Sequence, residues 1–357
     1  MPIVPLYGHR VLRRRLLDAA ERDALPASLL LHGARGVGKQ RLALWLGQAL
    51  LCTGSPRPCG ACQPCRYALE LCHPDLHWFF PRPRLKDADA SASDVRDDYA
   101  DAVQERVKAG GLYATPSGSE AIYVATVRAI VQIAAVAPAM ARRKVFVVGD
   151  AERMVPQEGA EAAANAFLKL LEEPLPDTTI VVTSSEPGAL LPTIRSRVVS
   201  VRVPRLPDED VADFVDDPVV SAALDRERVV KGSAERVRLA AGAPGALLGD
   251  ADRGAAADAA RQMLDAATRA GEGPRLRLAL AQKPAGARGG FTDTLHALTL
   301  LLNERARDAL RQRDERAARA ASRAVERVER AKGMAAGNVN PQLVSAALLR
   351  ELAAELR

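Results

Sequence analysis

The chain has 357 residues, of which 48% are hydrophobic and only 4% aromatic, which favours two or three domains with helix-rich cores. Lys and Arg number 50 against 44 acidic residues, and the net charge of +6 fits work near nucleic acid or an ordinary solvated surface. No apolar run approaches a membrane span and the first residues lack the apolar core of a signal peptide, so we expect a soluble, cytoplasmic protein with no membrane partner.

A short apolar segment and a glycine-rich loop begin the first domain. Residues 28–32 (SLLLH) predict a buried strand, and the following GARGVGKQ matches a phosphate-binding loop except at its last position. Such a loop holds phosphates with its backbone N–H groups and its lysine, and its final hydroxyl binds Mg²⁺. The candidate nucleotide-binding residues are Gly33, Gly36, Gly38, Lys39 and Gln40. Because Gln40 offers an amide in place of the hydroxyl, the loop predicts a degenerate site and argues against ATP binding with Mg²⁺.

A cysteine cluster follows the first helix of this domain. Cys59, Cys62 and Cys65 stand at two consecutive C-x-x-C spacings, and four thiolates close a tetrahedral structural zinc site. The fourth ligand is open: Cys52 is favoured because it ends the P-loop helix, while Cys72 or His73 could replace it. An iron–sulfur cluster is the alternative metal centre, although the C-P ending of one such motif is absent. The sequence therefore predicts a zinc module at about residues 52–65.

An insertion separates this module from the rest of the domain. Residues 81–119 are rich in Asp, Ala, Arg, Pro and Gly, with little apolar periodicity beyond 94–108. We expect a surface insertion that is partly helical, and its sequence indicates no function. The apolar spacing over 122–140 then predicts a buried helix.

The second half of a nucleotide site is an apolar strand that ends in an acidic pair. Residues 144–148 (KVFVV) predict that strand. If the metal-binding acid follows at once, Gly149 replaces it and Asp150 takes the position of the water-activating acid. A register one residue later makes Asp150 the metal ligand and Ala151 the missing base. Either register lacks one acid of the pair, and phosphoryl transfer needs both Mg²⁺ and a positioned water or base. We therefore expect no intrinsic ATPase activity.

The remaining elements complete an α/β pattern. Residues 160–171 predict a helix that Pro174 ends, and residues 179–182 predict another buried strand. Ser184, just after that strand, is placed at the ligand edge of the sheet or in ordinary turn chemistry. The alternation of strands and helices predicts a doubly wound sheet. Arg197 is either a local ion-pair partner or an arginine offered to a neighbour's nucleotide.

Several motifs occur together in one order. They are the P-loop, the cysteine cluster, NAFLKLLEEP at 165–174, TSSEP at 183–187, and Ser196-Arg197. In this order they resemble the AAA+ subunits of the bacterial clamp loader, and the chain is most similar to their delta-prime branch. The resemblance covers about residues 6–80 and 120–205.

The resemblance implies roles for particular residues. Ser196 and Arg197 fall on the arginine-finger motif, with Val198 in place of its cysteine, and residues 183–185 fall on the sensor region. The zinc ligands carry over to Cys52, Cys59, Cys62 and Cys65. No arginine is available around residues 242–246 for the second sensor, which is a third departure from an active ATPase site.

The resemblance also implies a function and partners. The chain would be a non-hydrolysing stator of the clamp loader in the DNA polymerase III holoenzyme, supplying Arg197 in trans to a gamma/tau subunit. The hetero-oligomeric ring, which also contains delta, would load the sliding clamp on primer–template DNA. The alternatives are an active ATPase of the gamma/tau type and a stand-alone zinc-ribbon protein whose DNA binding would be strongly salt-dependent.

The family's domain order implies an AAA+-like domain at 1–206, a small helical lid at 207–252 and an all-helical collar at 253–357 that joins subunits. Within the collar, the sequence predicts one long helix over 303–332 and a final helix with Asn340 as N-cap and Pro341 as first helical residue. A bundle without any partner explains the same pattern.

Overall fold

The computed structural model describes residues 2–85, 90–114, 116, 120–154, 161–227, 232–248, 250–269, 271–282, 288–336 and 339–356. The chain divides into two compact units, Met1–Leu248 and Gly249–Arg357. The first contains the sheet, and the described part of the second is helical. No helix in these described ranges is both long enough and apolar enough to span a membrane.

A parallel sheet of five strands organises the first unit. The strands lie in the order β2-β3-β4-β1-β5. Their bounds are Ser28–His32 (β1), Leu76–Phe79 (β2), Lys144–Val148 (β3), Thr178–Ser184 (β4) and Val199–Arg202 (β5). β3 and β4 are buried along their whole length, as expected of parallel strands covered on both faces. The predicted α/β fold with a parallel sheet is confirmed.

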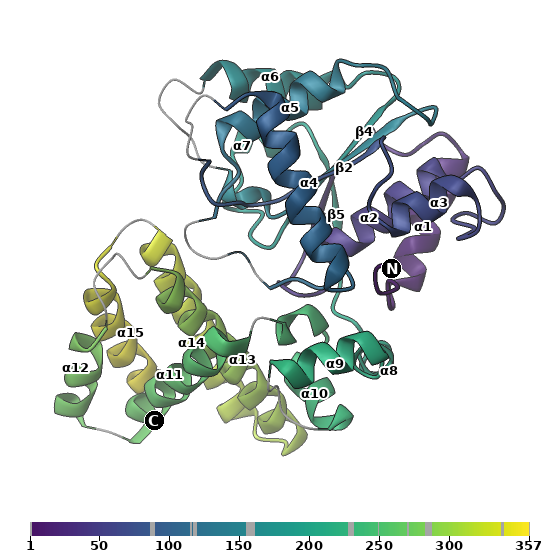
Figure 1. Cartoon of the computed structure of the whole chain (residues 1–357). Coiled ribbons are helices and arrows are strands. Elements are labelled where there is room, and N and C mark those ends of the chain that lie inside the picture. The colour runs from purple at the N-terminus through teal and green to yellow at the C-terminus, as the bar shows by residue number, and fades with distance from the viewer. Residues whose placement is uncertain are drawn as a thin grey trace. The chain divides into compact units, whose positions relative to one another are not determined.

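Helices cover both faces of this sheet (Figure 1). On one side, α2 (Lys39–Leu51) lies against β1 to β4, with α1 (Arg10–Glu21) and α3 (Gln63–Leu69) beside it. On the other side lie α5 (Val124–Ala134), α6 (Glu161–Glu172) and the short α7 (Pro192–Arg195). Because α2 begins directly after β1 and the loop, the loop and the carboxyl ends of β3 and β4 meet at one edge of the sheet.

The insertion contributes a helix with a buried face. α4 (Ala92–Lys108) begins with a capping box, in which Ser91 Oγ accepts from the Asp94 backbone N–H and the Asp94 carboxylate accepts from the Ser91 N–H. Val95 and Tyr99 are buried, and the helix packs against α5 and β2. The predicted helix is confirmed, but the segment is part of the core and not only a surface addition. Residues 86–89, 115 and 117–119 of the insertion lie outside the described residues.

A helical segment completes the first unit. It contains α8 (Asp208–Val215), α9 (Pro218–Arg226), α10 (Ser233–Ala240) and the 3₁₀ turn η2 (Pro244–Leu247). A separate apolar cluster holds it together, and Val4 of the N-terminal segment belongs to that cluster. The predicted lid at 207–252 falls largely in this segment, and its boundary stays a prediction.

The second unit is a bundle of α11 (Asp250–Arg269), α12 (Glu272–Leu280), α13 (Arg288–Arg311), α14 (Glu315–Ala336) and α15 (Pro341–Leu356). The predicted cap is confirmed, because Asn340 Oδ1 accepts from the Gln342 N–H at 2.8 Å. The single helix predicted over 303–332 is wrong. The chain turns at Arg313, which has a left-handed φ of 59°, and α13 packs against α14. Asp314 then caps α14 by accepting from the Ala317 N–H.

Candidate functional site

The predicted phosphate loop lines a cavity of about 890 Å³, a volume that includes its opening to solvent. Gly36 and Gly38 have φ angles of 82° and 89°, which glycine adopts without steric cost. A Cβ on Gly36 would lie 2.5 Å from the Ala246 nitrogen, so the backbone of η2 contacts the loop directly. Apolar side chains from the N-terminal segment and from the helical segment complete the wall: Val4, Leu6, Leu206, Phe214 and Leu248.

Lys39 is buried at the base of the cavity and bonds to the loop itself. Its Nζ donates to the carbonyls of Gly33 and Ala34 at 3.0 Å each, and to Ser185 Oγ at 2.9 Å. Burial lowers the pKa of Lys39 to about 8, although the nearby carboxylates of Asp150 and Glu152 oppose that shift.

Gln40 fills the position from which an ordinary P-loop binds Mg²⁺. Its Nε2 donates to Asp150 Oδ2 at 2.9 Å, and its Oε1 accepts from the Trp78 indole N–H at 2.9 Å. A Cβ on Gly149 would lie 2.3 Å from that same Oε1. The amide therefore occupies the space of a larger residue at position 149, and it engages the carboxylate that faces the loop.

The acidic side of the site contains one residue that the sequence prediction passed over. The Asp150 backbone N–H donates to Thr183 Oγ1 at 3.2 Å, so its carboxylate is presented toward Gln40. Glu152 is half-buried, and its Oε1 accepts from the Ser185 N–H at 3.0 Å. Burial, with the Asp150 charge, raises the pKa of Glu152. Only the D-x-E spacing at 150–152 could have indicated this residue from the sequence.

Ser184 and its neighbour point to different places. Ser184 is fully buried, and its Oγ accepts from the Glu186 N–H, whereas Ser185 lines the cavity and accepts from Lys39. Residues 242–246, where the family would have its second-sensor arginine, contact the phosphate loop through their backbone. The Gly245 N–H donates to the Gly36 carbonyl at 2.9 Å. The helical segment thus closes onto the phosphate loop without a charged side chain from residues 242–246.

The end of the insertion forms another part of the cavity wall. Gly111, Leu112 and Tyr113 line it, and the Val4 N–H donates to the Gly110 carbonyl at 2.7 Å. Arg106 of α4 stacks on aromatic rings that support this wall, with its guanidinium carbon 4.0 Å from the Tyr113 centroid and 4.5 Å from a Trp78 ring centroid. The sequence prediction missed these residues, because nothing in their local pattern indicates a nucleotide site.

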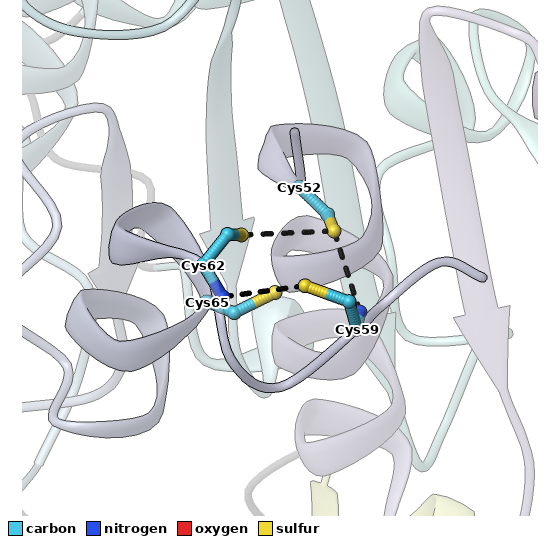
Figure 2. Close-up of side chains that lie close together, drawn as sticks. All are labelled: Cys52, Cys59, Cys62 and Cys65. Carbon is cyan, nitrogen blue, oxygen red and sulfur yellow. Dashed lines mark hydrogen bonds between the residues drawn. The ribbon is translucent and has the colours of Figure 1, made fainter. Parts of the chain in front are cut away.

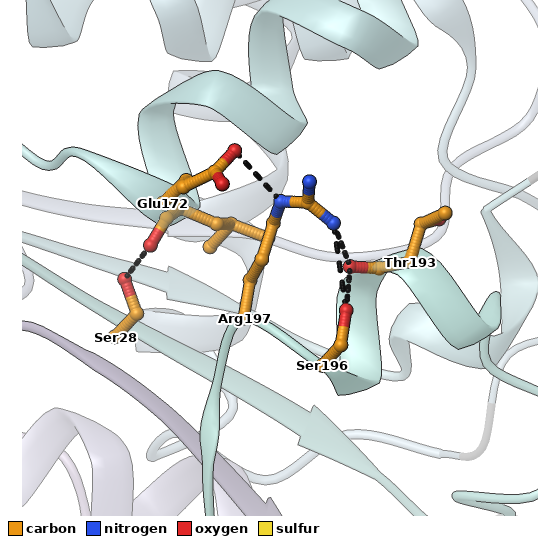
Figure 3. A network of polar contacts seen from close by, with 6 residues as sticks. Ser28, Glu172, Thr193, Ser196 and Arg197 are labelled. Atoms are coloured by element: carbon orange, nitrogen blue, oxygen red, sulfur yellow. Dashed lines mark hydrogen bonds and ion pairs between the residues drawn. The ribbon is translucent and has the colours of Figure 1, made fainter.

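Arg197 is held on the outside of the α/β unit by two elements (Figure 3). Its Nε donates to Glu172 Oε2 at the end of α6, and its Nη1 donates to the Thr193 carbonyl in α7, both at 3.0 Å. Ser196 Oγ donates to the same carbonyl at 3.1 Å. Within the described part of the chain, the cavity lining does not include Arg197. The side chain is therefore paired locally, and it does not serve this chain's own phosphate loop.

The four cysteines of the predicted metal module converge on one point (Figure 2). Their sulfur atoms lie within 4.8 Å of one another, and those of Cys52 and Cys62 are 3.8 Å apart. A tetrahedral ion with bonds of about 2.3 Å places its sulfur ligands about 3.8 Å apart. Backbone N–H groups of Gly54 and Cys59 donate to Cys52 Sγ, which suits a thiolate. These residues could hold a metal ion such as zinc.

The other candidates for a fourth ligand lie elsewhere. Cys72 is exposed and its thiol faces the Tyr67 carbonyl, while His73 Nδ1 accepts from the Asp75 backbone N–H. Within the described residues, the group of potential metal ligands around Cys59 contains neither of them.

Comparison with known proteins gives consistent matches. A family model described as "DNA polymerase III, delta subunit" matches residues 8–207. The DNA polymerase III delta-prime subunit of Bacillus subtilis is 26% identical over 212 residues, which cover 59% of this chain and 52% of that protein. The Pseudomonas aeruginosa delta-prime subunit is 32% identical over 177 residues, covering 49% of this chain and 42% of that protein.

The matched region spans about half the length of these curated relatives. Among solved structures, a DNA polymerase III gamma subunit-related protein from Thermotoga maritima aligns with 98% of this chain and 99% of its own, at 17% identity and a TM-score of 0.40. The family model covers more than half of the chain and several relatives carry the same name, so the chain belongs to the family of bacterial DNA polymerase III delta-prime subunits.

Proposed function

We propose that this chain is a non-hydrolysing clamp-loader subunit that offers Arg197 to the ATP of a neighbouring subunit. The observation that carries the proposal is the Gln40 amide, which bonds to Asp150 and Trp78 where an active P-loop binds Mg²⁺. Without that metal and its positioned water, the chain's own site has no means to stabilise phosphoryl transfer. Arg197 stands apart from this site, as a residue acting in trans must.

The assembly belongs to the same proposal. The partners are gamma/tau and delta subunits in a ring that opens the sliding clamp at primer–template DNA. The lid at 207–252 and the collar at 253–357 would place the chain in the ring, the collar by contacts between subunits. The membership in the delta-prime family supports these partners.

The test measures ATP turnover by the chain alone and in a mixture with active clamp-loader ATPase subunits. We expect no turnover by the chain alone, and a loss of about 10³-fold in the mixture when Arg197→Ala replaces the wild type. Arg195→Ala is the matched control, because Arg195 is an exposed arginine two positions before Arg197. DNA-stimulated hydrolysis by the isolated chain would instead support the gamma/tau alternative, in which Asp150 and Gln40 form a working metal site.

We further propose that the four-cysteine module binds structural zinc. Cys52, Cys59, Cys62 and Cys65 supply four ligands, so the ion would have no open coordination position and would fold the turn after α2 without taking part in catalysis. One equivalent of zinc in the purified chain, measured by elemental analysis, is the expected result. Iron with an optical spectrum of a cluster would overturn it.

A further inference from the structure

The strand β5 (Val199–Arg202) forms an open edge of the parallel sheet. It pairs with β1, and among the described residues no further strand lies beside it. Parallel strands are usually covered on both faces, as β3 and β4 are in this sheet. In β5, by contrast, three of the four residues are exposed, and 50% of the Val199 surface is open to solvent. The strand therefore presents both a free edge and exposed side chains.

The register of β5 on β1 determines which backbone groups point outward. Arg202 is paired with His32, and the Val203 N–H donates to the His32 carbonyl at 2.7 Å. Alternate residues of a parallel strand bond to the same neighbour, so Val201 also faces β1. The N–H and C=O groups of Ser200 and Arg202 then point away from the sheet. Such a row of outward backbone groups can pair with another strand.

The two faces of β5 differ in chemistry. Val199 and Val201 share one face of the strand, and Ser200 and Arg202 share the other. The surrounding segment, residues 191–206, contains four arginines and no acidic residue. Side chains on facing strands stabilise a sheet when they are both apolar or opposite in charge. A strand that suits this edge is therefore apolar on one face and acidic on the other.

We propose that the free edge of β5 binds an extended peptide segment of a partner protein in which acidic and apolar residues alternate. The segment adds a strand to the sheet through hydrogen bonds to the outward groups of Ser200 and Arg202. Its acidic side chains lie on the Arg202 face, and its apolar side chains cover the valine face. The inference goes beyond the proposed stator function and does not depend on it, because the residues that hold Arg197 lie in α6 and α7.

The charge of residues 191–206 distinguishes this occupant from two others. Two copies of the chain paired through β5 would bring their arginine-rich segments together, and like charges on facing strands are destabilising. Nucleic acid phosphates could accept from the arginines and from the outward N–H groups, but they have no donor for the outward carbonyls. An acidic peptide strand satisfies the arginines, the N–H groups and the carbonyls together.

The first test is fluorescence anisotropy of the full chain with a labelled, end-capped peptide of about seven residues in which Glu and Val alternate. We expect saturable binding with a dissociation constant below about 1 mM. A peptide with Lys in place of Glu tests the charge, and one with Pro in place of Val keeps the charge but cannot form a ladder. Each should bind at least about tenfold more weakly. Equal binding of the proline peptide would overturn strand addition, and so would the absence of saturable binding.

Variants of the strand separate edge pairing from general attraction. Ser200→Pro removes an outward N–H and leaves the bonds to β1, so it should weaken binding by about tenfold or more. Ser200→Ala keeps that N–H and should bind like the wild type, and circular dichroism checks that both variants are folded. Arg202→Glu should also weaken binding by about tenfold. Arg226→Glu, at an exposed arginine of α9, changes the net charge equally and is its control. Equal losses in the two charge reversals would contradict the assignment.

Amide hydrogen exchange locates the bound peptide. Saturation should slow exchange of the Ser200 and Arg202 amides by about tenfold or more, while the Val203 amide, already bonded to His32, should change little. Dimerisation of the chain that the peptide abolishes, or a single-stranded oligonucleotide that binds more tightly than the peptide and protects the same amides, would overturn the choice of occupant. No nucleotide is present in these measurements, so their failure is distinguishable from failure of the stator test.

Discussion

At the scale of residues, the two departures from an active P-loop, Gln40 and Gly149, are in contact with each other in the structure. From the sequence, Gln40 and the missing acid at 149 are separate changes. In the structure, the Gln40 Oε1 lies where a Cβ on Gly149 would be 2.3 Å away. A side chain at 149 would therefore displace the Gln40 amide from its present position between Asp150 and Trp78. Restoring either residue alone should not restore the metal site.

The cysteine module allows a matched pair of substitutions. Cys59→Ser removes one of four converging sulfurs, while Cys72→Ser removes an exposed thiol outside the cluster. We expect Cys59→Ser to lose its zinc and to lower the thermal unfolding temperature, because the free energy of metal binding contributes directly to folding. Cys72→Ser should keep one zinc per chain and its unfolding temperature. Zinc content by elemental analysis and calorimetry of both variants give the comparison, and equal zinc loss would contradict the ligand set.

At the scale of elements, the insertion helix supports the cavity from behind. Arg106 inserts its guanidinium among Trp78, Phe80 and Tyr113, with its carbon 3.3 Å from the Phe80 centroid. Burial disfavours the charged form of this guanidinium and lowers the pKa of Arg106 to about 10. The stacked rings connect α4 to β2 and to the wall formed by residues 111–113.

Removing this side chain should destabilise the first unit. Arg106→Ala loses the stacking contacts and leaves a void among three rings, so we expect a loss of about 2 kcal/mol in unfolding free energy. Lys108→Ala, on the exposed end of the same helix, should change it by less than about 0.5 kcal/mol. Chemical unfolding monitored by tryptophan fluorescence compares the two, since Trp78 lies in the cluster. Similar stabilities would mean that the insertion is not part of the core.

The sequence predicted elements where local pattern and burial agree. β3 is a run of five apolar or buried residues, and the cap at Asn340 is a local signal, so both are confirmed. β5 has four mostly exposed residues, and it becomes a strand only by pairing with β1, which no local pattern encodes. The break at Arg313 lacks a glycine or proline, so the propensity for a continuous helix misled the prediction.

The same distinction applies to the site. The residues of the phosphate loop, Gly33 to Lys39, are consecutive in the chain, so the sequence alone predicts the loop. The bond from Gln40 to Asp150 joins residues 110 positions apart, and the aromatic support of Arg106 joins the insertion to β2. Such contacts depend on the sheet order and could not be predicted from one sequence.

At the scale of the whole molecule, the first unit contains two features of an ATPase subunit at separate places: the phosphate loop and Arg197. Its own phosphate loop retains positive charge but has an amide in the metal position, while Arg197 lies outside the cavity. Under the proposed function, a neighbouring subunit supplies the reacting phosphate, and this chain supplies only a positioned cation. The orientation of that cation then becomes the property on which turnover by the ring depends.

Glu172 is the residue that sets this orientation. Its carboxylate accepts from Nε of Arg197 while the Thr193 carbonyl accepts from Nη1, and within the described residues Nη2 has no hydrogen-bond partner and can meet a phosphate. We predict that Glu172→Ala lowers ATP turnover of the mixed assembly by about three- to tenfold, the size of a partly exposed ion pair that positions a catalytic group. Glu172→Gln retains an oxygen acceptor for Nε and should recover most of that loss. Because the effect acts on orientation, it should appear in kcat with little change in the KM for ATP.

The control is Glu173→Ala, which removes an exposed carboxylate from the next position without touching Arg197. It should leave turnover by the mixture unchanged. If Glu172→Ala instead raised turnover, the carboxylate would be a competitor that must release Arg197 before the neighbour's phosphate can bind it. If both alanine variants lowered kcat equally, the effect would belong to the negative charge of this surface and not to the geometry of the arginine. The decisive comparison is therefore between neighbouring glutamates that differ only in whether they hold the guanidinium.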